Sequence, residues 1–168
     1  MKDKTVLRSE INEYARKNQV KELRQSINEG KDINNIDESG ATPLHCAIAW
    51  RHPEAVEVLL ESGADILLQD REGKTALHYA VEFNLPQVAE MLLRKNPKVI
   101  SISDNHGNQP LWTAAFNANG NYEIVSLLLN HGGNPEHRNR VNLSPLDIPK
   151  RKRDPALLEL LEAKCSGE

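Results

Sequence analysis

The sequence predicts an all-α solenoid of stacked helix–turn–helix units with short β-hairpin turns. Two observations predict this fold class. A turn-like stretch recurs about every 33 residues, and an apolar pattern with helical spacing follows its copies. One such unit cannot bury its own apolar face, so neighbouring units must stack to form the core.

The turn-like stretch reads DESGATPLH at residues 37–45 and recurs as DREGKTALH from residue 70, DNHGNQPLW from residue 104 and NRVNLSPLD from residue 139. Gly40 suits a backbone with positive φ in the hairpin, and Asn142 takes its place in the last copy. Thr42 can cap a helix that begins at Pro43, because proline lacks only an N–H that would be unpaired there. Each copy therefore predicts a hairpin followed by a helix.

The first helix of each unit is expected to be short and apolar on one side. Leu44, Ala47 and Ile48 share one face of this helix. Small residues recur at the position of Ala47, as Ala80 and Ala114 in later units, so successive first helices can approach one another closely.

The second helix of each unit carries its own apolar stripe. In the first full copy this stripe is formed by Val56, Leu59 and Leu60. We expect each second helix to end in a left-handed residue, which in successive copies is Gly63, Asn96 and Gly132.

Both ends of the array depart from this pattern, as the capping units of a solenoid do. Residues 7–34 lack the hairpin but keep a helical apolar pattern. Pro149 stands inside the expected first helix of the last unit, so that helix should be short or distorted. We expect one domain over residues 1–168, with an N-terminal capping repeat at 7–36, central repeats at 37–69, 70–103 and 104–138, and a C-terminal capping repeat at 139–163.

This combination of features resembles the ankyrin repeat, whose period is about 33 residues and whose pattern includes T-P-L-H-x-A. The resemblance covers nearly the whole chain. It implies a non-enzymatic protein that binds another protein with its hairpin tips and the exposed side of its first helices. It also implies that His45 and His78, at the motif position, form local hydrogen bonds that stabilise the turn.

Candidate contact residues are the variable positions between those that hold the stack together. At the hairpin tips they are Glu38, Ser39, Ala41, Arg71, Glu72, Lys74, Asn105, His106, Asn108, Arg140 and Val141. On the first helices they are Arg16, Lys17, Ala49, Trp50, Glu82, Phe83, Trp112, Phe116 and Asn117.

Aromatic residues stand out among these candidates. The chain has only two Trp, three Tyr and two Phe, yet Trp50, Phe83 and Phe116 fall at or beside the same helix position, and Trp112 replaces the histidine of the motif. Exposed aromatic side chains are typical anchors of protein interfaces. The alternative is that these rings fold back and fill the space between repeats.

Two polar segments also depart from the repeat. The connection at residues 117–122 reads NANGNY and is longer than its counterparts, which is typical either of a contact loop or of a tolerated surface insertion. The run KRKR at residues 150–153 is a candidate nuclear address or anion-binding patch, or simply a solvated loop.

Composition narrows the function further. A net charge of −3 with mixed signs argues against a nucleic-acid partner. No stretch approaches the roughly 20 apolar residues that span a bilayer, so we expect no membrane partner. Cys46 and Cys165 are far apart and fit no metal spacing, which favours a reducing, cytoplasmic location. We predict no catalytic residue, no cofactor and no metal ligand.

The expected function is therefore to bind, and thereby inhibit, a partner protein, with the free protein a monomer. The stretch PLWTAAFN at residues 110–117 and the longer loop after it resemble small bacterial ankyrin proteins that neutralise a cognate toxin as immunity proteins. The alternatives are a eukaryotic-type ankyrin regulator or scaffold of a kinase or transcription factor, and, from another class, an undetected enzyme.

Overall fold

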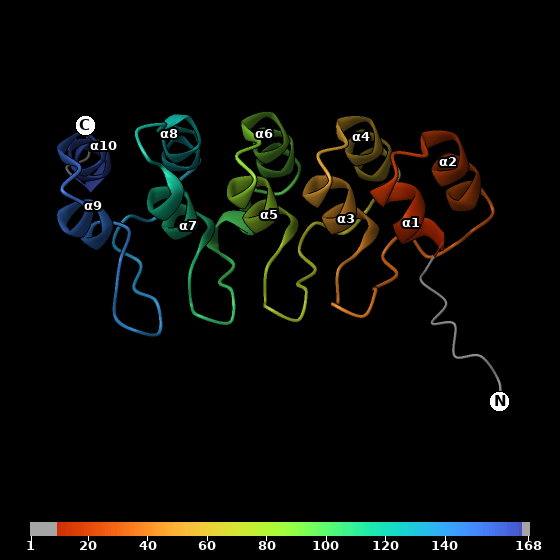
Figure 1. Cartoon of the computed structure of the whole chain (residues 1–168), viewed down its shortest axis with the longest axis horizontal. Helices are drawn as coiled ribbons and strands as arrows, with labels where there is room; N and C mark the ends of the chain where they lie inside the picture. Colours follow the sequence, from red (N-terminus) through yellow and green to blue (C-terminus); the bar gives the residue numbers. More distant parts are fainter. Residues whose placement is uncertain (1–9, 166–168) are drawn as a thin grey trace.

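The computed structural model describes residues 10–165, apart from the side chain of Cys165. Five helix pairs stand side by side in a single row (Figure 1). In chain order the pairs are α1 (Glu10–Arg16) with α2 (Val20–Asn28), α3 (Pro43–Ala49) with α4 (Pro53–Glu61), α5 (Ala76–Glu82) with α6 (Pro86–Lys95), α7 (Pro110–Asn117) with α8 (Glu123–Asn130), and α9 (Asp147–Lys152) with α10 (Pro155–Cys165). The all-α solenoid is confirmed.

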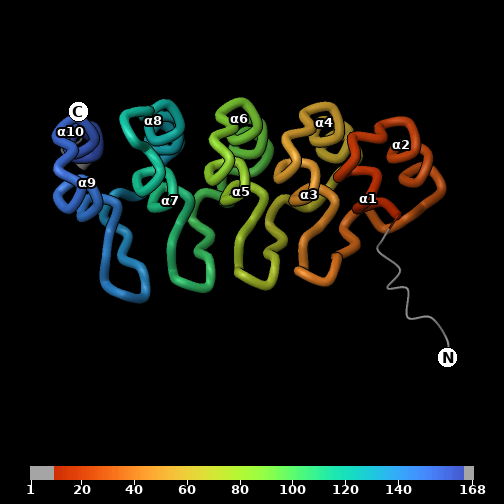
Figure 2. Tube along the Cα trace, in the orientation of Figure 1, coloured from red at the N-terminus to blue at the C-terminus, as the bar shows by residue number. Residues whose placement is uncertain are grey.

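The hairpins hang from one side of the row, next to the first helices (Figure 2). No β-strand is assigned to them, or anywhere else within residues 10–165. The positive φ of +80° at Gly40 and of 60° at Asn142 confirms the predicted turn. Successive hairpins are joined by backbone hydrogen bonds of 2.9 Å, from the N–H groups of Arg71, Asn105 and Arg140 to the carbonyls of Ser39, Glu72 and His106 respectively.

Each full motif caps its own first helix and also binds the next unit. The Thr42 side chain accepts from the backbone N–H of His45, while Nδ1 of His45 accepts from the backbone N–H of Thr42 at 3.1 Å. Because Nδ1 is an acceptor, Nε2 carries the proton and donates to the carbonyl of Lys74, 3.2 Å away in the following hairpin. The same arrangement joins Thr75, His78 and the carbonyl of Asn108.

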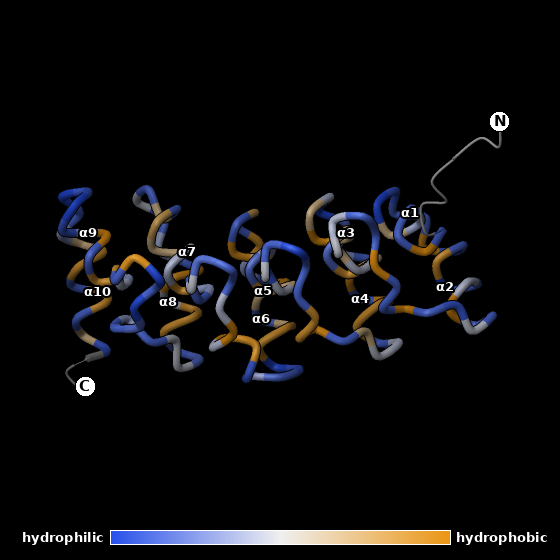
Figure 3. The backbone as a smooth tube through the Cα atoms, turned by 90° about the horizontal axis from the view of Figure 1, so that it is seen from below, coloured by the Kyte–Doolittle hydropathy of each residue, from blue (hydrophilic) through white to orange (hydrophobic). Residues whose placement is uncertain are grey.

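The core runs along the row between the two layers of helices. Figure 3 shows hydrophobic segments along the helices, while most of the hairpin tips are hydrophilic. Leu44, Ala47 and Ile48 of α3 are buried, as are the equivalent alanines of later first helices, Ala80 and Ala114. Both expected apolar faces are therefore confirmed, since Val56, Leu59 and Leu60 of α4 are buried as well.

The expected left-handed helix ends are confirmed in two of three places. Gly63 has a φ of +89° and Gly132 a φ of +88°. The prediction is wrong for Asn96, whose φ is −154°. Pro97 follows directly, and a residue before proline is sterically confined to an extended backbone. Asn96 instead caps the 3-10 helix η1 (Pro97–Ser101) with its side chain.

Of the two end units, the C-terminal one has a shorter first helix than the central units. Residues 7–9, where the first unit is expected to begin, lie outside the described range. Helix α9 has only 6 residues, which confirms the short helix predicted from Pro149. This proline sits in the first turn of α9, where its missing N–H costs no helical hydrogen bond. Helix α10 continues to Cys165, beyond the expected limit of 163.

Candidate functional site

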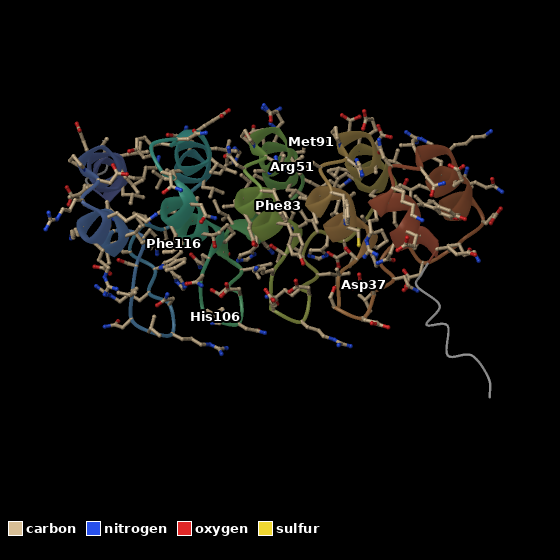
Figure 4. All side chains as sticks on the ribbon, in the orientation of Figure 1. Asp37, Arg51, Phe83, Met91, His106 and Phe116 are labelled. Carbon is tan, nitrogen blue, oxygen red and sulfur yellow. The ribbon has the colours of Figure 1, made fainter. Side chains whose placement is uncertain are left out.

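The hairpins and the first helices of the central units form one surface, which we call the inner face. Figure 4 shows Asp37 and His106 on the hairpins, with Phe83 and Phe116 on the first helices above them. A hollow on this face is lined by residues of two hairpins and of α5, among them Glu38, Ser39, Arg71, Glu72, Tyr79 and Phe83. Side chains from separate repeats are thus brought together.

The aromatic side chains form an interrupted row on this surface. Trp50 and Phe83 follow the last residues of α3 and α5, and Phe116 lies near the end of α7. Trp50 is 58% exposed and Phe116 is 50% exposed, whereas Phe83 and Trp112 are half-buried. The alternative that the rings are sealed between repeats is therefore wrong for Trp50 and Phe116.

The ring of Phe83 is held by neighbours from two units. Its centroid lies 6.2 Å from that of Tyr79, and the guanidinium of Arg51 lies 5.9 Å from the Phe83 centroid. Arg51 was not predicted as a site residue. The sequence does mark this position, because Arg51 stands where the next unit has Asn84. In the structure both residues adopt a positive φ just after their helix.

A second aromatic cluster lies at α7. The rings of Trp112 and Phe116 stack with centroids 5.2 Å apart, and Nζ of Lys152 lies 4.7 Å from the Phe116 centroid. Nε1 of Trp112 is buried and has no hydrogen-bond partner within the described residues. Because Trp112 replaces the motif histidine, the hydrogen bond that His45 and His78 form with the following hairpin has no counterpart at this indole. Nε2 of His137 lies 3.0 Å from the carbonyl of Gly107, within the repeat that also contains Trp112.

Charge on the inner face is concentrated around Lys74. Its Nζ lies 3.0 Å from Glu72 and 2.9 Å from Glu82. Burial alone would lower the pKa of Lys74, but the hydrogen bonds and charges of both glutamates outweigh burial and raise that pKa. Lys74 therefore remains ionised, and its two ion pairs link a hairpin to the end of α5.

The recurring hairpin aspartates are structural. Oδ1 of Asp37 accepts from the backbone N–H groups of Ser39 and Ala41, and Oδ2 accepts from Arg16. Burial would raise the pKa of Asp37, but the hydrogen bonds and the charge of Arg16 lower it, so the carboxylate is retained. The recurrence of aspartate at this position is therefore explained by its hydrogen bonds within the hairpin and is no sign of catalysis.

The other predicted contact residues fall into three groups by exposure. Those exposed are Lys17, Glu38, Ser39, Arg71, Glu72, Glu82, Asn105, His106, Asn117, Arg140 and Val141. Arg16, Ala49 and Lys74 are half-buried. Asn108 and Ala41 are buried, so the prediction that they lie open at the tips is wrong. Asn108 donates to Asp104 at 3.2 Å and accepts from Asn139 at 2.8 Å, because its side chain turns toward the next hairpin.

The longer connection between α7 and α8 contacts the last repeat. The hydroxyl of Tyr122 donates to Asp154 at 2.7 Å, and Lys152 donates to the carbonyl of Phe116. The extension fastens the C-terminal unit to its neighbour.

The buried histidines predict how stability depends on pH. Burial lowers the pKa of both His45 and His78 below the ordinary value of 6.5, although nearby carboxylates and carbonyls oppose it. Below that pH these two histidines bind protons in the unfolded chain, whereas in the folded chain they bind protons only at a lower pH. The free energy of unfolding should therefore fall as the pH drops from about 6.5 toward 5, by up to about 1.4 kcal/mol per pH unit for each histidine.

Urea unfolding at a series of pH values measures this dependence. The exposed His106 offers a matched control, since His106→Gln should keep the full slope, whereas His78→Gln should remove about one proton from it. A free energy of unfolding that stays constant between pH 7 and 5 would contradict buried neutral histidines.

Within residues 10–165, no three His, Cys, Asp or Glu side chains gather where they could hold a metal ion. Cys46 is buried with a free thiol, and the side chain of Cys165 lies outside the described part. None of the described helices has the length and apolar character needed to cross a membrane.

Comparison with known proteins places these features in a family. The family model described as ankyrin repeats (3 copies) matches residues 67–139. The family model described as ankyrin repeats (many copies) matches residues 27–80. Ankyrin repeat and SOCS box protein 14 of Mus musculus is 33% identical over 135 residues, which cover 70% of this chain. The match spans 20% of the length of that mouse protein.

Proposed function

The chain belongs to the ankyrin-repeat family, and we propose that it binds a partner protein through the inner face and thereby inhibits that partner. Ankyrin repeats generally act as non-enzymatic interaction modules. The observation that carries the proposal is the exposure of Trp50, just after α3, and of Phe116, near the end of α7. Exposed aromatic side chains are typical interface anchors, and a partner that covers them removes their apolar surface from water.

The kind of inhibition is part of the proposal. The resemblance of residues 110–117 to small immunity proteins supports a bacterial toxin as the partner, with its active site covered or held inactive. The rival proposal is a eukaryotic-type regulator or scaffold of a kinase or transcription factor. Measuring the activity of the purified partner with and without this protein separates inhibition from scaffolding, because a scaffold leaves that activity unchanged.

The double variant Trp50→Ala with Phe83→Ala tests the surface. The partner is first recovered by pull-down, identified by mass spectrometry and purified. Binding to the variant should be about 100-fold weaker or more, because aromatic anchors typically contribute about 2 kcal/mol or more each. The melting temperature should be nearly unchanged.

Met91→Ala, on the second helix α6, is the matched control and should bind normally. Unchanged affinity of the double variant would overturn the proposed surface. A fall of several degrees in its melting temperature would instead show that the two rings belong to the core.

The proposal also includes a cytoplasmic location and a monomeric state in the absence of the partner. Sedimentation of the purified chain measures the second of these directly. A dimer at low concentration would contradict it.

A further inference from the structure

A second hollow lies at the N-terminal end of the inner face, where α1 meets the first hairpin. It is lined by three residues of α1 and three of the hairpin, namely Asn12, Glu13, Arg16, Asp37, Glu38 and Ser39. Glu38 and Ser39 also line the hollow beside Phe83, so the two hollows share a wall. A polypeptide lying along the inner face can therefore reach into this one.

Asn12, which lines this hollow, carries a buried hydrogen-bond acceptor without a partner in the described chain. The residue is only 1% exposed. Its Nδ2 donates to the carbonyl of Ala41 at 2.9 Å, which fixes the orientation of the amide, while Oδ1 has no partner within the described residues. Buried polar atoms are rarely left unpaired, so this oxygen points to a missing donor.

The charges of the hollow favour a cationic donor. Arg16 is already bound to Glu13 at 2.7 Å and to Asp37 at 3.1 Å. Lys17, outside the hollow, lies 3.3 Å from Glu13. Within residues 10–165 Glu38 forms no ion pair, so its exposed carboxylate is the one in the lining without a counter-charge.

We propose that this hollow binds an arginine or lysine side chain of the partner, whose cationic group donates to Oδ1 of Asn12 and pairs with the carboxylate of Glu38. This inference rests on the proposed function, because it supplies one anchor of the same interface. A neutral amide could satisfy Asn12 but would leave Glu38 without a counter-charge. A basic side chain satisfies both groups.

The test uses small probes and the full chain, without the partner. Acetyl-arginine amide and acetyl-lysine amide are titrated into the isotope-labelled protein, and chemical shifts are followed by NMR. Acetyl-citrulline amide, which has the shape of the arginine probe without its charge, is the control ligand. We expect saturable shifts at the side-chain amide of Asn12 and the backbone of Ser39, with a dissociation constant on the order of millimolar for one or both basic probes.

Glu38→Gln should weaken the binding of that probe about threefold or more, and the exposed Glu57→Gln on α4 should leave it unchanged. Because Glu38 is exposed and forms no ion pair in the described chain, its variant should fold normally. Equal shifts from citrulline, equal weakening by both variants, or no shift at Asn12 would each overturn the inference. Failure of the probes would leave the Trp50 and Phe83 result intact, so the two proposals fail separately.

Discussion

Leu59→Ala is expected to lower the free energy of unfolding by about 2–5 kcal/mol. Leu59 lies in α4 and is completely buried. Truncation to alanine loses the free energy of transferring the missing atoms from water and leaves a cavity that the packed helices fill only in part. Chemical denaturation at neutral pH measures the loss.

The same helix supplies the control. Glu57 is exposed on α4, and Glu57→Ala should change the free energy of unfolding by no more than about 0.5 kcal/mol. Similar values for the two variants would mean that the apolar stripe of α4 does not face the core. A solenoid assembled from stacked pairs would then be the wrong description of this chain.

Gly73→Ala is expected to lower the free energy of unfolding by about 3 kcal/mol or more, from a left-handed backbone and broken hairpin hydrogen bonds. Gly73 has a φ of +76°, and a Cβ atom built there would lie 2.7 Å from the backbone nitrogen of Asn105. That nitrogen donates to the carbonyl of Glu72, and the Asn105 side chain donates to the carbonyl of Arg71. The added methyl group would therefore separate two neighbouring hairpins.

Gly63→Ala isolates the effect of the clash. Gly63 has a similar φ of +89°, but a Cβ atom there meets nothing within 4 Å. Only the backbone strain applies, so the expected loss is about 1–2 kcal/mol. Thermal and urea unfolding of the two variants measure the difference. Equal losses would show that hairpin contact contributes nothing to the stack.

Local features of the fold could be predicted because the residues that cause them are close in sequence. Thr42 caps the helix that begins at Pro43, and Gly40 permits the turn that precedes them. Asn96 shows the limit of such reasoning by residue type. Asparagine tolerates a left-handed backbone, yet the following Pro97 excludes it, and this neighbour decided the outcome.

The candidate site was predicted only as far as the repeat determines exposure. Trp50 and Phe116 follow from their position in the unit, and both are exposed. Asn108 was misplaced because its burial depends on Asn139, a residue of the next unit. The hollow at Asn12 could not be predicted either, since α1 lacks the motif and its register against the first hairpin is set by tertiary packing.

The histidine bonds between units give the array a direction. His78 obtains its acceptor from the carbonyl of Asn108, which the ribosome adds long after His78 itself. A repeat that has just emerged during translation thus keeps an unmatched imidazole N–H until its successor is made. Truncating the gene after residue 103 would remove the acceptor of His78. The loss of one unit therefore also destabilises the unit that precedes it.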